Sequence, residues 1–204
     1  MSVVRRLPRY YRFLDYLNKE GVVRISSREL AEKMGLTASQ IRQDLNCFGG
    51  FGQQGYGYNI KVLYKEISTI LGLDREYKMV IVGTGNLGQA LANYTKYYKL
   101  GFPIIGMFDV NPKIIGLRIN DIEVMDSENL LDFLNSNHVD IGIITTDKAA
   151  AQSVADKLVE GGVRGIWNFA PCDLKVPKNV PVENVHVTDT LNSLVYHIIH
   201  AEDD

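Results

Sequence analysis

The stretch from residue 79 to residue 109 constrains the fold more than any other part of this 204-residue chain. The apolar run Met79–Val82 is typical of a buried strand, and it leads directly into a glycine-rich turn over residues 83–88. Helix-forming residues follow, and a second apolar run ends at Asp109, 21 residues after Gly88. A strand, a glycine turn, a helix and a second strand with a terminal acid predict a βαβ unit that binds a dinucleotide.

Each part of this motif has a physical reason. Gly83 permits the tight turn, and Gly85 lets the backbone approach a pyrophosphate without a Cβ in the way. Gly88 lets the helix lie close to the sheet, and the N–H groups of its first turn face the phosphates. Asp109 would accept hydrogen bonds from a ribose diol and repel a 2′-phosphate, so it favours NAD(H) over NADP(H). The competing interpretation is a glycine turn that only packs a helix on a strand. The candidate cofactor contacts in the motif are Gly83, Thr84, Gly85, Asn86, Leu87, Gly88 and Asp109.

The βα pattern continues beyond this unit. Residues 139–144 predict a buried strand followed by a helix through Leu158, and residues 165–171 predict another strand. The expected fold class is therefore α/β, with a Rossmann-like, doubly wound parallel sheet over residues 76–187. Ligands bind at the carboxyl ends of such strands, although loop hydrogen bonding would explain the same residue types. The candidates for the nicotinamide side are Thr145, Thr146, Asn168 and Pro171.

The first 75 residues differ in charge and pattern from the rest. Residues 1–74 carry 11 Lys and Arg against 7 Asp and Glu, whereas the remainder carries 11 against 17. A basic module joined to an acidic one suggests that the first part meets a polyanion. Pro8 fits the first turn of a helix that ends at Gly21. Capping boxes at residues 26–29 and 37–40, separated by Gly35, predict a helix-turn-helix pair.

The second helix of this pair has a divided surface. Ile41, Leu45 and Phe48 form a core stripe, while polar side chains suited to base edges and phosphates point elsewhere, as on any solvated helix. Residues 49–58 contain five glycines with aromatics and amides, which predicts a hairpin, the wing of a winged helix; the absence of a GKS/T motif excludes a P-loop. A helix over residues 61–71 completes the module. The candidate DNA contacts are Arg9, Arg12, Ser39, Gln40, Arg42, Gln43, Asn46, Gln53, Gln54 and Tyr56.

The last segment has apolar residues at 191, 194, 195, 198 and 199, which is a helical stripe. This stripe either packs on its own domain or crosses to a second subunit, and a two-fold DNA reader favours a dimer. The expected domains are 1–75, 76–187 and 188–204.

Several classes of protein are excluded by absent motifs. No apolar run approaches the roughly 18 residues of a membrane span, and the N-terminus lacks a secretory h-region. Cys47 and Cys172 have no metal-ligand spacing and fit a reducing cytoplasm. No catalytic arrangement and no metal site can be assembled, and little chain remains for a substrate domain, so the pattern indicates a sensor.

The combination of these motifs resembles the redox-sensing transcriptional repressors of the Rex family. The resemblance covers nearly the whole chain and rests on RLPRYYRFL, SSRELAEKMG, QIRQDLNCFG, GYGY, VIVGTGNLGQALANY, FDVNP, NFAP and the C-terminal helix. It implies a homodimer with exchanged C-terminal helices that binds palindromic operator DNA. It also implies that NADH binding releases the DNA, whereas NAD⁺ permits or supports DNA binding.

The resemblance also assigns residues. Arg12 and Tyr94 match an arginine and a tyrosine that some relatives use to relay the nicotinamide state between domains. The carboxylate partner in those relatives aligns with His186, and Asp189 follows three residues later. Tyr94 is therefore a further candidate cofactor contact. The alternatives are a small NAD-dependent oxidoreductase with a dimerising helical module, or a DNA-binding protein whose ligand is another nucleotide such as CoA.

Overall fold

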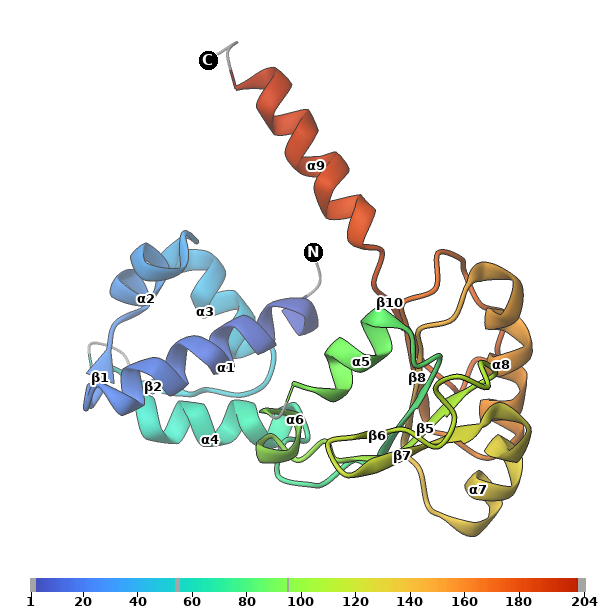
Figure 1. Ribbon diagram of the computed structural model, residues 1–204. Helices are drawn as coiled ribbons and strands as arrows, with labels where there is room; N and C mark the ends of the chain where they lie inside the picture. Colours follow the sequence, from blue (N-terminus) through green and yellow to red (C-terminus); the bar gives the residue numbers. More distant parts are fainter. Residues whose placement is uncertain (1–2, 54–55, 95, 202–204) are drawn as a thin grey trace. The chain divides into compact units, whose positions relative to one another are not determined.

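The structure is a computed structural model that describes residues 3–53, 56–94 and 96–201, without the side chains of residues 52 and 53. The chain divides into two compact units, residues 1–75 and 76–204. Figure 1 gives the course of the chain and the element labels.

The first unit combines helices with a small sheet. β1 pairs with β3, and β3 pairs with β2, both antiparallel, in the order β1-β3-β2. The hairpin of β2 and β3 therefore matches the sequence prediction, whereas the two-residue β1 was not predicted. Its elements are α1 (Val3–Lys19), β1 (Arg24–Ile25), α2 (Ser27–Met34), α3 (Ala38–Asn46), β2 (Gly52–Gln53), β3 (Gly57–Asn59) and α4 (Ile60–Ile70).

The start of α1 differs from the prediction. The helix begins at Val3, so Pro8 lies inside it rather than in its first turn. A proline there removes the N–H that would bond to the carbonyl of Val4. Val4 and Pro8 are both exposed, so water can satisfy that carbonyl. Leu7, Tyr10, Leu14 and Leu17 are buried, and burial of this stripe compensates for the lost bond.

The helix caps explain where α2 and α3 begin. Ser26 and Glu29 form the predicted reciprocal capping box, and Gly35 ends α2 in the left-handed region with φ +61°. Thr37 caps α3 through its side chain, which accepts a hydrogen bond from the Gln40 N–H at 3.1 Å. The second box is only half formed, because the Gln40 amide donates to Asp44 instead.

The second unit is built on one seven-stranded sheet. The strand order is β10-β9-β8-β4-β5-β7-β6, and every neighbouring pair is parallel except β7 with β6. Its elements are β4 (Met79–Val82), α5 (Asn86–Ala92), α6 (Lys96–Lys99), β5 (Ile104–Asp109), β6 (Arg118–Ile119), β7 (Ile122–Asp126), η1 (Ser127–Asn129), α7 (Leu130–Ser136), β8 (Ile141–Ile144), α8 (Lys148–Glu160), β9 (Gly165–Asn168), β10 (Val182–Asn184) and α9 (Val187–His200).

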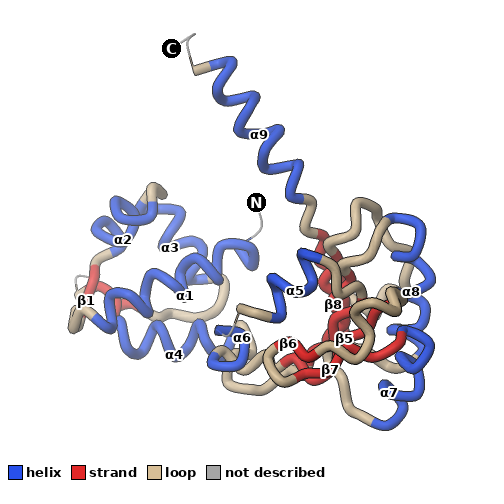
Figure 2. Tube along the Cα trace, viewed as in Figure 1, coloured by secondary structure: helices blue, strands red, loops and turns tan. Residues whose placement is uncertain are grey.

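Helices cover the two faces of this sheet unequally. On one face, buried residues of α7 and α8 pack against β4, β5, β8 and β9 (Figure 2). On the other face, α5 contributes Ala92 and Leu91 to a smaller cluster around Ile81, Met107 and Ile143. Both faces of the central strand β4 are buried, as its continuous apolar run predicts.

Two helical segments have bounds that the residue pattern alone left open. The helix after the glycine turn is short and ends at Ala92, and a separate turn of helix, α6, begins at Lys96. The last helix begins at Val187, one residue before the expected C-terminal segment 188–204, and none of its residues is buried. None of the helices in the described ranges combines the length and the apolar character that crossing a bilayer requires.

Candidate functional site

The glycine turn joins β4 to α5 at the carboxyl edge of the sheet. Gly83 has φ +98°, and a Cβ there would lie 2.8 Å from the carbonyl of Thr145. A Cβ on Gly88 would lie 2.1 Å from the carbonyl oxygen of Gly83, so this position holds the helix against the turn. Gly85 has open space around it, which leaves its backbone accessible to a ligand. Gly83 therefore makes the tight turn and Gly88 admits the helix, while the contact of Gly85 with a pyrophosphate stays a prediction.

Asp109 ends β5 and reaches the glycine turn. One carboxylate oxygen accepts a hydrogen bond from the Thr84 N–H at 2.5 Å, and the other accepts one from the Asn111 N–H at 2.8 Å. Thr84 itself is buried, and its hydroxyl donates to the carbonyl of Phe108. Asp109 thus fixes the turn as well as facing the site, and each oxygen retains a lone pair for a ribose hydroxyl.

A hollow of about 450 Å³ lies beside this turn. Gly83, Gly85 and Asp109 line one part of it, and Thr145 and Thr146 line the carboxyl end of β8. Its remaining walls are mostly small or apolar, as a nucleoside requires. They comprise Val82, Val110, Ser127, Leu130, Asp147, Ala150, Ser153, Val154 and Lys157.

The structure separates the candidates for the nicotinamide side. The Thr145 hydroxyl donates to the carbonyl of Gly83 at 2.5 Å, so it braces the turn. Pro171 is exposed in the loop after β9. Asn168 is fully buried, and its amide donates to Cys172 and Asn184 while its oxygen accepts from Ala170. These bonds indicate that Asn168 shapes the loop rather than touching a ligand directly.

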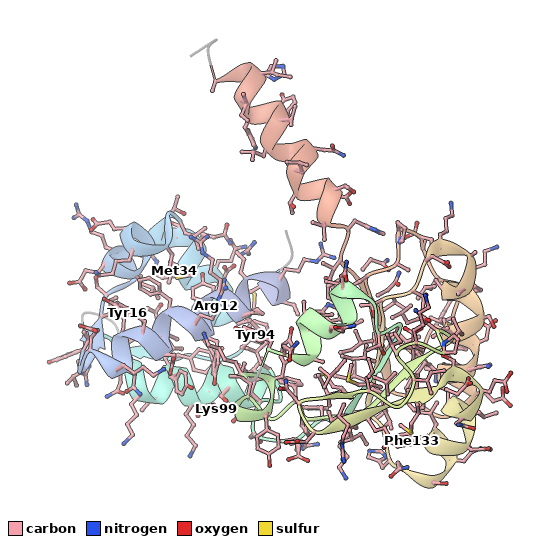
Figure 3. All side chains as sticks on the ribbon, viewed as in Figure 1. Arg12, Tyr16, Met34, Tyr94, Lys99 and Phe133 are labelled. Carbon is pink, nitrogen blue, oxygen red and sulfur yellow. The ribbon has the colours of Figure 1, made fainter. Side chains whose placement is uncertain are left out.

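Tyr94 and Arg12, the positions that the resemblance singles out, are both exposed. Tyr94 follows the end of α5, and Arg12 projects from α1 (Figure 3). The Tyr94 ring packs edge-on against Tyr97, with 4.8 Å between the ring centroids. Asn86 and Leu87, at the start of α5, are exposed as well.

The exposed surface of α3 carries four of the ten predicted DNA contacts. Ser39, Arg42, Gln43 and Asn46 are exposed. The Arg42 guanidinium donates to the hydroxyls of Ser27 and Ser39 at 3.1 and 3.2 Å, which holds it along the helix surface. These are weak, exposed contacts that a phosphate or a base can replace.

Gln40 departs from its predicted role, and a group that the sequence did not reveal explains why. Its amide donates at 2.7 Å to Asp44, a carboxylate with only 1% exposure. Arg6 binds both oxygens of Asp44, at 2.7 and 2.6 Å, and the Tyr10 hydroxyl donates at 2.9 Å. Gln40 is thus engaged inside the unit. The sequence of α3 alone did not predict that Asp44 is buried, because its ion-pair partner Arg6 is 38 residues away.

Hydrogen bonding controls the ionisation of this buried group. Burial favours a raised pKa for the Asp44 carboxyl, but the Arg6, Gln40 and Tyr10 donors overcome this and hold the pKa below its ordinary value. Burial and the neighbouring carboxylate raise the pKa of Tyr10. Asp44 is therefore charged at neutral pH, and it ties α3 to α1.

The remaining DNA candidates lie on different elements. The Arg9 guanidinium donates to the carbonyl of Met34, at the end of α2. Tyr56 is 71% exposed, and the Arg24 guanidinium lies 5.9 Å from its ring centroid. Gln53 lies in β2, with its side chain outside the description, and Gln54 lies outside the described residues.

A larger hollow, about 940 Å³, lies at the opposite edge of the sheet. It surrounds the amino-terminal ends of β4, β8 and β9 and is lined largely by apolar groups, including Tyr97, Phe102 and Trp167. Because ligands of parallel α/β sheets bind at carboxyl ends, its size does not make it the nucleotide site. Within the described ranges, no cluster of His, Cys, Asp or Glu could hold a metal ion.

Comparison with known proteins finds two family models that match successive parts of this chain. A family model described as a CoA binding domain matches residues 74–172, and one described as a putative DNA-binding protein N-terminus matches residues 1–46. The redox-sensing transcriptional repressor Rex of Clostridium botulinum (strain Eklund 17B / Type B) is 60% identical, over 97% of this chain and 94% of its own. The corresponding Rex of Thermoanaerobacter sp. (strain X514) is 58% identical, over 99% and 90%.

Two solved structures of the repressor RSP are also similar over most of both chains. RSP in complex with β-NAD⁺ and operator DNA is 58% identical with a TM-score of 0.93, over 98% of this chain and 92% of its own. RSP in complex with β-NADH is 55% identical with a TM-score of 0.91, over 100% and 95%. Because the full-length relatives are transcriptional repressors, the alternative of a small oxidoreductase is wrong. The chain belongs to the Rex family of redox-sensing transcriptional repressors.

Proposed function

We propose that this repressor acts in the cytoplasm as a homodimer that binds a palindromic operator and releases it when NADH occupies the hollow beside the glycine turn. Residues 1–75 read the DNA, residues 76–187 bind NAD(H), and residues 188–204 join the two subunits. The observation that carries this proposal is that one chain combines two features. These are the glycine turn with Asp109 and the helix pair α2 and α3 with its side-chain caps.

The nucleotide half of the proposal rests on the shape and chemistry of the hollow. Gly85 is the open point of the turn, where a pyrophosphate can approach the backbone. Asp109 would accept the ribose hydroxyls, and its charge would repel a 2′-phosphate. Thr146 and Pro171 lie on the side of the strand ends where the nicotinamide would extend, with Tyr94 as the residue that senses its state.

The DNA half of the proposal is a winged helix. α3 would enter the major groove with Arg42, Gln43, Asn46 and Ser39, and the β2–β3 hairpin would lie along the backbone as the wing. Arg9, Arg12 and Tyr56 would add contacts to phosphates. Gln40 is assigned to the internal contact with Asp44 rather than to a base.

The dimer is inferred from α9. Its apolar side chains are 45–67% exposed, with Leu191, Leu194, Val195, Ile198 and Ile199 along one stripe. A two-fold dimer would bury this stripe against the second subunit and place two α3 helices about 34–36 Å apart, one turn of DNA. His186 directly precedes α9, and Asp189 lies in the first turn of α9. His186 and Asp189 are the two candidates for the partner of Arg12 in a relay, and Asp189 is the carboxylate of the two.

Switching requires a large difference in affinity. Moving a two-state dimer almost completely from the DNA-binding to the released form needs about 10⁴-fold preference of NADH for the released form. Two sites in one dimer can share this requirement. The uncharged reduced ring and the positively charged oxidised ring differ enough to be distinguished by a polar site.

The test is fluorescence anisotropy on a labelled palindrome selected from a random pool, titrated with NADH at a fixed excess of NAD⁺. Release of DNA by NADH supports the proposal, and DNA binding that ignores NADH but responds to CoA supports the other nucleotide. Arg42→Ala should weaken operator binding without changing NADH affinity. Lys178→Ala, which removes an exposed charge in the second unit, is the matched control.

A further inference from the structure

Asn168 occupies a junction of three chain segments inside the second unit. It is the last residue of β9 and is fully buried. Its amide donates to the carbonyl of Cys172 at 2.8 Å and to Oδ1 of Asn184 at 2.9 Å. Its side-chain oxygen accepts a hydrogen bond from the Ala170 N–H at 3.0 Å. One side chain therefore joins the loop after β9 to the end of β10.

The main chain strengthens the same junction. Asn168 and Asn184 are paired in the parallel register of β9 and β10. The carbonyl of Asn168 accepts a hydrogen bond from the Val185 N–H at 2.8 Å. Val185 directly precedes His186, which occupies the N-cap position of α9. The position and direction of the chain entering α9 thus depend on Asn168.

The loop on the other side of the junction is bonded to the end of β8, and the residues that follow β8, Thr145 and Thr146, line the hollow. Phe169 donates its N–H to the carbonyl of Ile144 at 2.9 Å, and Ile144 is the last residue before Thr145. The Phe169 ring lies 4.7 Å from Trp167 between centroids. Because this loop follows the carboxyl end of β9, it flanks the nicotinamide side of a dinucleotide in a parallel sheet.

We infer that the hydrogen bond from Asn168 to Asn184 couples the loop after β9 to the start of α9. A change in this loop on binding the reduced or oxidised nicotinamide would then change the position of α9. This inference rests on the proposed function, because it needs a dinucleotide in the hollow and α9 in the subunit interface. Asn168 and Asn184 are positioning residues: they touch neither DNA nor cofactor, and they set the geometry of the segment that does the switching.

An amide is well suited to this junction. Asn168 uses two N–H donors toward a carbonyl and Oδ1, and one oxygen toward an N–H. An aspartate there would place oxygen against two acceptors, and leucine would satisfy none of the three groups. Both changes would leave buried main-chain groups unpaired and destabilise the loop itself, so Asn168 is unsuitable for the test.

Asn184 offers a cleaner variant, because it is exposed and its loss admits water to the Asn168 amide. Asn184→Ala removes the link, and the exposed Asp173 provides a matched control. Asp173 accepts only a long contact of 3.4 Å from Asn184, so Asp173→Ala leaves the link to Asn168 intact.

The experiment measures operator affinity of the full chain by anisotropy, with saturating NAD⁺ and with saturating NADH, together with NADH affinity. The ratio of interest is the operator affinity with NAD⁺ divided by the operator affinity with NADH. We expect Asn184→Ala to reduce this ratio by about tenfold, which is within the usual range of coupling between two sites. NADH affinity and operator affinity with NAD⁺ should stay within about twofold of the parent values. Asp173→Ala should keep the parent ratio.

Two results would overturn the inference. One is a parental ratio in Asn184→Ala, and the other is an equal loss of NADH or operator binding in both cofactor states, which would make the bond purely structural. Failure of the proposed function is recognised separately, because the parent protein itself would then show no NADH-dependent release.

Discussion

Asp44 illustrates how one buried carboxylate can organise a DNA-reading surface. Four hydrogen bonds from Arg6, Tyr10 and Gln40 converge on its two oxygens. Buried charges are tolerated only when they are paired and fully hydrogen-bonded, and this one is. Its effect is to fix α3 against α1, so that the exposed residues of α3 keep one orientation.

The ionisation of Asp44 predicts an acid-sensitive first unit. Because its pKa in the folded state is lowered, its contribution to stability is present above the unfolded value, about 4, and is lost as pH falls through the folded value. Asn at position 44 should lower the free energy of unfolding by about 3 kcal/mol at pH 7, because Arg6 loses its buried partner.

Urea unfolding followed by circular dichroism checks this prediction. Trp167, the only tryptophan of the chain, reports the second unit separately through its fluorescence. The parent should lose stability as the pH falls below about 5, and Asp44→Asn should lose less stability in the first unit over the same range. Parallel pH profiles for the two proteins would contradict the assignment.

Asp109 gives a second prediction at the scale of a single residue. Asp109→Ala should weaken NADH binding by about tenfold or more, because hydrogen bonds to a charged group contribute about 1.5 kcal/mol or more. The change also removes the acceptor of the Thr84 N–H, so Asp109→Asn, which keeps an oxygen there, separates the two effects. Calorimetric titration with NADH measures both, and unchanged affinity in both variants would remove the ribose role.

At the scale of the element, α5 depends on contacts at both of its ends. Gly88 seats its first turn against Gly83, and Asn120, in the turn between β6 and β7, donates to the carbonyl of Ala92 at its last turn with a distance of 2.8 Å. The helix is only seven residues long, so propensity alone would not stabilise it. Its position, and that of Tyr94 after it, is set by tertiary contacts.

Two glycine variants should therefore behave in opposite ways. Gly88→Ala would bring a Cβ to 2.1 Å from Gly83 and should lower the stability of the second unit by about 1–3 kcal/mol. Gly85→Ala meets no atom within 4 Å and should leave stability unchanged while weakening NADH binding. Trp167 fluorescence in urea and NADH titration measure the pair. Equal destabilisation by both variants would show that Gly85 serves the fold rather than the ligand.

In the whole molecule, α9 is the helix whose apolar side chains have no packing partner in the described part of a single chain. Seven of its apolar and aromatic side chains are at least 45% exposed. A helix with such a stripe is stabilised mainly by packing. The proposed dimer supplies that packing, and it also provides the two-fold symmetry that a palindromic operator requires.

Charges placed on this stripe should disrupt the proposed dimer. The double variant Leu194→Asp and Ile198→Asp should sediment as a monomer and bind the palindrome at least about tenfold more weakly, since one subunit reaches only one half-site. The control is Ser193→Asp with His197→Asp, which adds the same substitutions on the other side of the helix. Sedimentation velocity distinguishes them, and a dimer in both variants would place the interface elsewhere.

The local features of both units could be predicted from the order of the residues. Strand β4, the glycine turn, Asp109 at the end of β5, the caps of α2 and α3, and the stripe of α9 all follow from residues a few positions apart. Periodicity, capping and left-handed glycines are short-range effects, so they can be read from the order of the residues. The fold class and the family followed from their combination.

Which polar side chains are free to bind depends on how the elements pack together. Gln40 and Asn168 belong to residue types that suit binding sites, yet Asp44 and Asn184 engage them inside their units. The position of Pro8 inside α1 and the pairing of β1 with β3 are likewise set by burial and by partners distant in sequence. The Gln40–Asp44 bond spans only four positions, but Arg6 and Tyr10, 38 and 34 positions from Asp44, hold that carboxylate in the interior. Asn184 is 16 positions from Asn168. Contacts at such separations depend on how the elements pack and produce no periodic pattern in the sequence.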